Sequence, residues 1–146
     1  MKHILYNKFI PFKGYKAMAI FPFIFVRSEY KDSNGISIVI NHENIHLHQQ
    51  KEVSTIGVLV AAVLIIFGCG WWSLLALPLF YWWYLTEYFI RFVLYGFNHR
   101  EAYRNISFEQ EAYTFQGNES YIKHRKYFYW LKYVPEKMYS RWPCQR

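Results

Sequence analysis

The sequence predicts an α+β protein that is mainly α-helical, with a small N-terminal β-hairpin or sheet and a helical hairpin embedded in a membrane. Three observations support this class. A long run without charged side chains occupies the middle of the 146-residue chain, β-branched and aromatic segments precede this run, and two helical segments follow it. We expect a single domain (1–146), because a chain of this length forms one hydrophobic core.

The composition excludes two classes of protein. Apolar residues make up 53% of the chain and aromatic residues 23%, so ample apolar surface is available for burial and intrinsic disorder is excluded. Two cysteines are too few for a disulfide scaffold. The net charge of +7 matters less for its size than for where the basic residues lie.

The first segment, residues 1–41, is expected to form the strands. Lys16–Arg27 is rich in Phe and Ile and is interrupted by a proline, which suits a strand at the edge of a sheet. A turn at Ser33-Asn34-Gly35 precedes Ile36–Ile40, whose β-branched side chains predict another strand. Asn41 is then the expected N-cap of a helix.

A membrane hairpin is expected to follow the helix that Asn41 starts. No charged residue occurs from Val53 to Thr86, a run of 34 residues, whereas one membrane-spanning helix needs about 20. Gly68-Cys69-Gly70 divides the run into two arms, and Pro78 is expected to kink the second arm, which ends at Phe97. The alternative is a buried hairpin in a soluble protein, but so short a chain could hardly bury two such arms.

Basic residues flank the hairpin on both sides. Of the 17 lysines and arginines, seven precede Val53, nine follow Phe97 and only Arg91 lies between. The positive-inside rule therefore predicts two membrane-spanning helices in the inner (cytoplasmic) membrane, with both termini on the cytoplasmic side. Glu87 and Arg91 are four residues apart, so we expect them to pair on one helix face.

Residues 98–133 are expected to form two helices before a tail at 134–146. The first is predicted over Arg100–Phe115. The second, over Tyr121–Tyr133, is basic and aromatic, and we expect it to lie on anionic lipid head groups of the bilayer. Basic and aromatic side chains together also suit nucleic acid, but lipid is the nearer anionic partner after a membrane hairpin, so we expect no nucleic acid.

His42-Glu43-Asn44-Ile45-His46 is a complete H-E-x-x-H motif within the segment 42–97. On a helix the two histidines share one face, so both imidazoles can bind one Zn²⁺. Glu43 lies beside the metal, where it can accept a proton from a zinc-bound water that attacks a carbonyl group. His48 is on another face, and we expect it at the surface rather than on the metal.

A catalytic zinc site takes three protein ligands and keeps one position open. The third ligand must come from elsewhere, and the helix after the hairpin offers Glu109 and Glu111, which cannot both reach the metal from one helix face. His99, Tyr103 and Arg104 precede these glutamates. They are candidates for polarising a substrate carbonyl, holding an oxyanion or binding substrate, with capping and interface roles as the alternative.

The order of H-E-x-x-H motif, hairpin and Glu-bearing helix resembles the membrane-embedded gluzincins, which include the CAAX prenyl protease and heat-shock membrane protease group and the β-lactam sensor-transducer group. Their third ligand lies in a Glu-x-x-Ala-Asp pattern that falls on Glu109–Tyr113. The resemblance implies Glu109 as the third ligand, with Glu111 as the fallback, and Tyr113 stands where the family has a supporting aspartate. Asn41–His46 and Ala102–Tyr113 are also similar to segments of short uncharacterised bacterial membrane proteins.

The motif and the resemblance together lead us to expect a membrane zinc metalloendopeptidase, a hydrolase that cleaves peptide or protein substrates at the cytoplasmic face. His42, His46 and Glu109 would bind zinc, and Glu43 would be the general base. The alternative is a catalytically inactive zinc-binding membrane protein with a structural or sensory role. The absent aspartate and the short chain favour this alternative.

Overall fold

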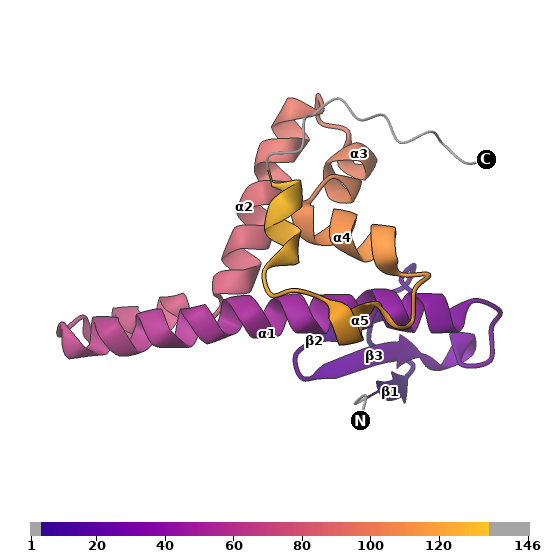
Figure 1. Cartoon of the computed structure of the whole chain (residues 1–146), viewed down its shortest axis with the longest axis horizontal. Coiled ribbons are helices and arrows are strands. Elements are labelled where there is room, and N and C mark those ends of the chain that lie inside the picture. The colour runs from indigo at the N-terminus through magenta and orange to yellow at the C-terminus, as the bar shows by residue number, and fades with distance from the viewer. Residues whose placement is uncertain (1–3, 135–146) are drawn as a thin grey trace.

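The computed structural model describes residues 4–134, and its longest element is α1 (Ile36–Ile66). Figure 1 shows the β-sheet on one side of the N-terminal part of α1 and α4 (Ser107–Phe115) on the other. α2 (Leu79–Leu94) leaves the middle of α1 crosswise. The protein is therefore mainly helical with a small sheet, as the sequence predicted.

The N-terminal sheet has three strands in the order β1-β3-β2. The strands are β1 (Ile4–Asn7), β2 (Ala17–Ile20) and β3 (Phe23–Arg27). β3 pairs in parallel with β1 and antiparallel with β2, where Ala17 lies opposite Val26. The segment predicted as one strand is therefore two strands joined at Phe21-Pro22. Ala17, Ile24 and Val26 are buried and form a core against α1.

The strand predicted over Ile36–Ile40 is wrong, because these residues form the first turns of α1. Ile36 and Val39 are three residues apart and both pack on the sheet core, so the β-branched side chains follow the helical period. Gly35, with φ at 80°, directly precedes the helix. Asn41, the predicted N-cap, is instead buried inside α1.

The helix predicted over Arg100–Phe115 is divided into α3 (His99–Arg104) and α4. Ile106 separates them because its backbone is extended, with φ −59° and ψ 135°, and its side chain is fully buried in the core. Asn41 satisfies backbone groups at the other end of α4. Its side-chain amide donates to the carbonyl oxygens of Phe115, Gln116 and Asn118.

The glycine turn predicted at Gly68–Gly70 separates α1 from η2 (Gly70–Ala76), a 3₁₀ helix that packs back along α1. The predicted second arm is therefore not one kinked helix. It is divided at Pro78, and α2 begins at the next residue. Gly57 permits this close packing, because a Cβ there would lie 2.4 Å from the carbonyl oxygen of Ala76.

Among residues 4–134, α1 is the one helix that is long and apolar enough to cross a membrane. The second predicted span is not present as a single helix of that length. The predicted pair of Glu87 and Arg91 is present, with 2.6 Å between Arg91 Nη2 and Glu87 Oε1. Glu87 also accepts hydrogen bonds from the backbone N–H and the hydroxyl of Ser107. Both charges of α2 therefore face the protein.

The helix predicted over Tyr121–Tyr133 is wrong, because α5 (Tyr121–His124) ends where the chain becomes extended at Arg125 and η3 (Tyr129–Tyr133) follows separately. Trp130 of η3 is buried in the main core. The other buried members of that core are Val53, Phe80, Ile106 and Phe108. The predicted tail lies outside the described residues, apart from its first residue.

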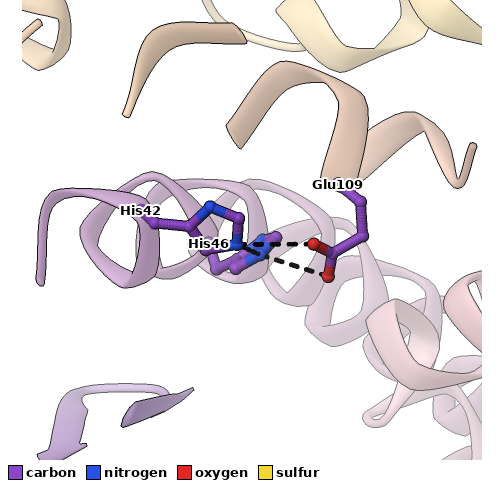
Figure 2. A group of neighbouring side chains, drawn as sticks. All are labelled: His42, His46 and Glu109. Atoms are coloured by element: carbon purple, nitrogen blue, oxygen red, sulfur yellow. Dashed lines mark hydrogen bonds and ion pairs between the residues drawn. The ribbon is translucent and has the colours of Figure 1, made fainter. Parts of the chain in front are cut away.

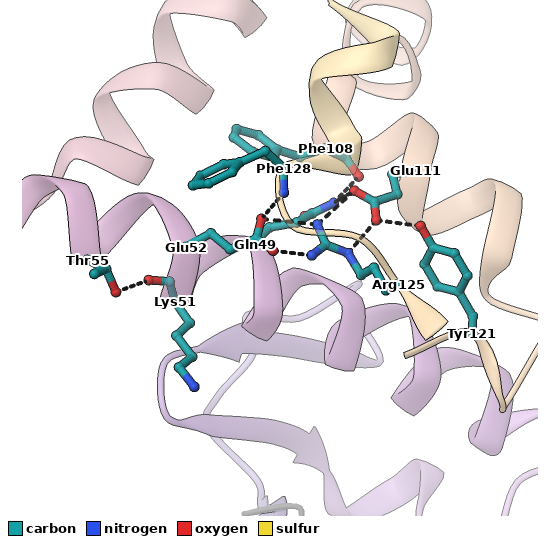
Figure 3. Close-up of polar contacts among 9 residues, drawn as sticks. All are labelled: Gln49, Lys51, Glu52, Thr55, Phe108, Glu111, Tyr121, Arg125 and Phe128. Carbon is teal, nitrogen blue, oxygen red and sulfur yellow. Dashed lines mark hydrogen bonds and ion pairs between the residues drawn. The ribbon is translucent and has the colours of Figure 1, made fainter. Parts of the chain in front are cut away.

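Arg125 does not face lipid head groups but is buried between two carboxylates, as Figure 3 shows. Its guanidinium pairs with Glu52 of α1 and with Glu111 of α4, and Nε lies 2.5 Å from Glu111 Oε1. The Tyr121 hydroxyl donates to Glu111 and the backbone N–H of Phe128 donates to Glu52. The cluster therefore joins α1, α4 and the chain after α5.

We expect the Arg125→Met variant to be destabilised by about 3–5 kcal/mol, because it leaves two buried carboxylates without their cation. The free energy of unfolding in detergent micelles measures this loss. Arg27→Met is the control, because the carboxylate that it leaves unpaired, Glu29, is 55% exposed and stays solvated, so a smaller loss is expected. Equal losses in the two variants would contradict the structural role of Arg125.

Candidate metal centre

The three predicted ligands lie together, as Figure 2 shows. His42 and His46 project from the same face of α1, and Glu109 reaches them from the first turn of α4. The two Nε2 atoms are 3.1 Å apart. Glu109 Oε2 lies 3.4 Å from His42 Nε2, and Oε1 lies 3.3 Å from His46 Nε2. All three residues are buried.

These distances fit a metal ion between the three side chains. Zinc with bonds of about 2.0–2.1 Å to nitrogen and oxygen places tetrahedral ligand atoms roughly 3.3 Å apart. Glu109 Oε2 is buried and has no hydrogen-bond partner within the described residues, as expected for a ligand atom without its ion. The group of His42, His46 and Glu109 could therefore hold a metal ion.

The outer nitrogen of each imidazole is held by a glutamine. His46 Nδ1 lies 2.7 Å from Gln49 Oε1, and His42 Nδ1 lies 3.2 Å from Gln116 Oε1. Because an amide oxygen only accepts hydrogen bonds, each Nδ1 carries a proton and donates it. Both Nε2 lone pairs then point toward Glu109, an arrangement that is stable only around a cation, either a proton or a metal ion.

Gln49 connects the metal ligands to the Arg125 cluster. Its Nε2 donates to the carbonyl oxygen of Phe108 at 3.0 Å and to Glu111 Oε2 at 3.0 Å, so the orientation of the amide is set. Glu111 is thereby engaged with Gln49, Tyr121 and Arg125. Of the two candidate glutamates, Glu109 is the one that the structure places beside the histidines.

Two tyrosine hydroxyls surround the Glu109 carboxylate. Tyr84 donates to Oε1 at 2.9 Å, and the Tyr103 side chain lies close enough for the Glu109 charge to act on its hydroxyl. Burial alone raises the pKa of Glu109, but the charge of His46 and the contacts with both imidazoles outweigh it and hold that pKa well below its ordinary value. Burial and the Glu109 carboxylate raise the pKa of Tyr103, so its hydroxyl remains protonated and can donate.

A cavity of about 570 Å³ opens beside the ligands, between β2 and the first turn of α2. His46 and Glu109 line it together with Glu43, the predicted general base. The Glu43 carboxylate lies near the backbone of Ala19 in β2. Most of the other lining residues are apolar or aromatic, and they include Phe12, Tyr15, Met18, Ile20, Phe80, Tyr81, Tyr84 and Tyr103.

Of the three substrate-binding candidates, Tyr103 lines this cavity. His99 is exposed, and the Tyr88 hydroxyl lies 2.9 Å from its Nδ1. Arg104 is also exposed and lies over the ring of Tyr113, 5.9 Å from its centre. Tyr113, at the position of the aspartate in the resembling family, packs its ring edge-to-face on His42 with 4.7 Å between centroids. Tyr113 therefore supports a ligand by packing.

Gln49, Gln116 and Tyr84 contact the ligands but were not predicted as site residues. The signal for the two glutamines is helical spacing, because Gln49 follows His42 by seven residues and Gln116 follows Glu109 by seven. These spacings place each glutamine on the face of its helix that carries a ligand. No local spacing could have predicted Tyr84, because it contacts Glu109, which is 25 positions away in the sequence.

Comparison of the chain with protein-family models, with curated proteins and with solved structures finds no match. The resemblance to membrane-embedded gluzincins therefore stays a prediction. The chemistry of the site follows from the positions of its own side chains.

Replacing a ligand should abolish metal binding. We expect His46→Ala and Glu109→Ala to retain no zinc after incubation with Zn²⁺ and dialysis, because two ligands cannot complete the site. His48→Ala is the control, because His48 is outside the three-ligand group and should retain zinc as the unsubstituted chain does. Metal analysis of the purified proteins measures the difference, and zinc retained by His46→Ala would contradict the assignment.

Gln49→Leu should weaken zinc binding by about 10–100-fold, because His46 loses the acceptor that orients its ring. Competition with a fluorescent chelator measures the affinity. Gln110→Leu is the matched control, because Gln110 is another buried glutamine, but its amide bonds to Asn105 away from the ligands. If both variants lost the same affinity, general destabilisation rather than ring orientation would be the cause.

Proposed function

We propose that this protein is a membrane-bound zinc metallopeptidase that hydrolyses peptide bonds at the cytoplasmic face. One observation carries the proposal. Two histidines of an H-E-x-x-H helix and a buried glutamate from α4 converge within 4.8 Å of one another, beside a cavity that the motif glutamate also lines. The resemblance to membrane-embedded gluzincins supports the same conclusion.

Each residue has a defined part in this proposal. When bound by His42, His46 and Glu109, zinc would polarise the substrate carbonyl and lower the pKa of water toward neutrality. Glu43 is the general base that accepts the proton of the attacking water and delivers it to the leaving amine. Tyr103, which lines the cavity as a protonated donor, stabilises the oxyanion.

The cavity favours substrates with large apolar side chains beside the cleaved bond. Phe12 and Met18 line it from the sheet side, and Phe80 and Tyr81 line it from α2. Burying a large apolar side chain against such a wall contributes about 1.5–3 kcal/mol. We therefore propose a peptide or protein segment rich in apolar residues as the substrate class.

We further propose that the apolar hairpin anchors the protein in the inner membrane, with both termini on the cytoplasmic side. The uncharged run from Val53 to Thr86 supports the anchor, and the basic residues that flank it support the orientation. The metal ligands on α1 precede this run, which would keep them on the cytoplasmic side of the lipid.

We expect Glu43→Gln to lower hydrolysis by about 10²–10⁴-fold while zinc remains bound, because the amide cannot accept the proton. Cleavage of casein or self-cleavage by the purified protein, together with metal analysis, tests both parts. His48→Ala should keep the activity of the unsubstituted chain. Full zinc occupancy without any hydrolysis that depends on Glu43 would instead identify an inactive zinc-binding protein with a structural or sensory role.

A further inference from the structure

The outer surface of the hairpin and of α2 is an apolar face that neither the core nor the metal centre uses. At the end of the hairpin, Phe67 is 79% exposed and Trp71 is 87% exposed. Along α2, Leu85, Phe89 and Val93 are 56%, 65% and 47% exposed. These three recur every four residues, so they form one stripe on the side of α2 that points away from the core.

The apolar face carries no charged side chain. The run from Val53 to Thr86 has no charged residue, and the two charges of α2, Glu87 and Arg91, pair with each other. Glu87 is further held by Ser107, and Arg91 Nη2 contacts the carbonyl oxygen of Tyr133. Both side chains therefore point into the protein and leave the outer stripe uncharged. Such a stripe suits hydrocarbon better than water.

The direction of α2 limits how deeply the hairpin can enter a bilayer. Gly57 is where α1 contacts the start of α2, and Figure 1 shows α2 leaving crosswise while the end of α1 and η2 project beyond it. From Gly57 to Phe67 the helix advances about 15 Å at 1.5 Å per residue. The hydrocarbon core is about 30 Å thick, so the projecting part matches one leaflet.

We propose that the hairpin enters a single leaflet, with α2 lying flat along the boundary between lipid tails and head groups. This arrangement rests on the membrane anchoring proposed above but not on hydrolysis. It buries the stripe of α2 and the hairpin in lipid at once. It also keeps the cavity, whose wall includes Phe80 and Tyr81 of α2, at the membrane surface. Segments emerging from the lipid would then reach the metal centre directly.

The two-span arrangement predicts a different depth for each residue. It places Trp71 at the far interface, where tryptophan is favoured, and inclines α2 across the bilayer. Leu85 and Val93 would then differ in depth by up to about 12 Å, because eight residues separate them on the helix. In the single-leaflet arrangement Leu85, Phe89 and Val93 share one shallow depth, and Phe67 lies deeper than all three.

The test measures these depths in the full chain. Single cysteines replace Phe67, Leu85, Phe89 or Val93, one at a time, in a background with Cys69→Ser and Cys144→Ser. Each variant is labelled with a fluorophore and placed in vesicles of phosphatidylcholine and phosphatidylglycerol that carry quenchers near the head group or deep in the acyl chain. Glu119→Cys, at an exposed loop position, is the control and should not be quenched.

We expect equal quenching by the shallow quencher at all three α2 positions, and stronger quenching by the deep quencher at Phe67→Cys. An impermeant thiol reagent should reach Phe67→Cys from neither side of the vesicle. A progressive change in depth along α2, with labelling of Phe67→Cys from the far side, would overturn the proposal in favour of two spans. Absence of quenching at every position would overturn it together with the membrane anchoring, whatever the hydrolytic activity.

Discussion

The packing of α4 on α1 is the constraint on which the metal centre depends, and buried charge holds it. Arg125 bridges Glu52 of α1 and Glu111 of α4, and all three side chains are buried. Because breaking such a pair leaves an uncompensated charge, the two helices have little freedom to separate or slide. Glu109, two residues from Glu111 on α4, is thereby held within 3.4 Å of both imidazoles.

Hydrogen bonds link the Arg125 cluster to the metal ligands. Gln49 accepts from His46 and donates to Glu111, so ring orientation and helix packing are coupled through one side chain. Tyr113 packs against His42. An aromatic ring cannot accept a proton or a strong hydrogen bond as an aspartate does, but it restricts the rotation of the imidazole. The imidazoles are therefore oriented by packing and amide hydrogen bonds, whereas the buried ion cluster holds the helix that carries Glu109.

The two sides of α2 have different surroundings. α2 contributes its first turn to the cavity wall and Tyr84 to the Glu109 carboxylate, while its outer stripe is exposed and uncharged. One helix thus touches both the proposed reaction site and the proposed lipid surface. This double use explains why an apolar substrate segment fits the proposal.

Local spacing by itself determined the features that lie close together in the chain. The four-residue interval between His42 and His46 requires only a helix, and the glycines at Gly68 and Gly70 break an apolar run wherever it packs. Contacts between distant segments decided the rest. Ile36–Ile40 is helical rather than extended because its side chains pack on the sheet core. Arg125 is buried rather than exposed because two carboxylates 73 and 14 residues away pair with it. The position of Glu109 beside the histidines also depends on tertiary structure. Glu109 and Glu111 are two residues apart and have the same local sequence signal, so only the packing of α4 on α1 decides which of them reaches the histidines.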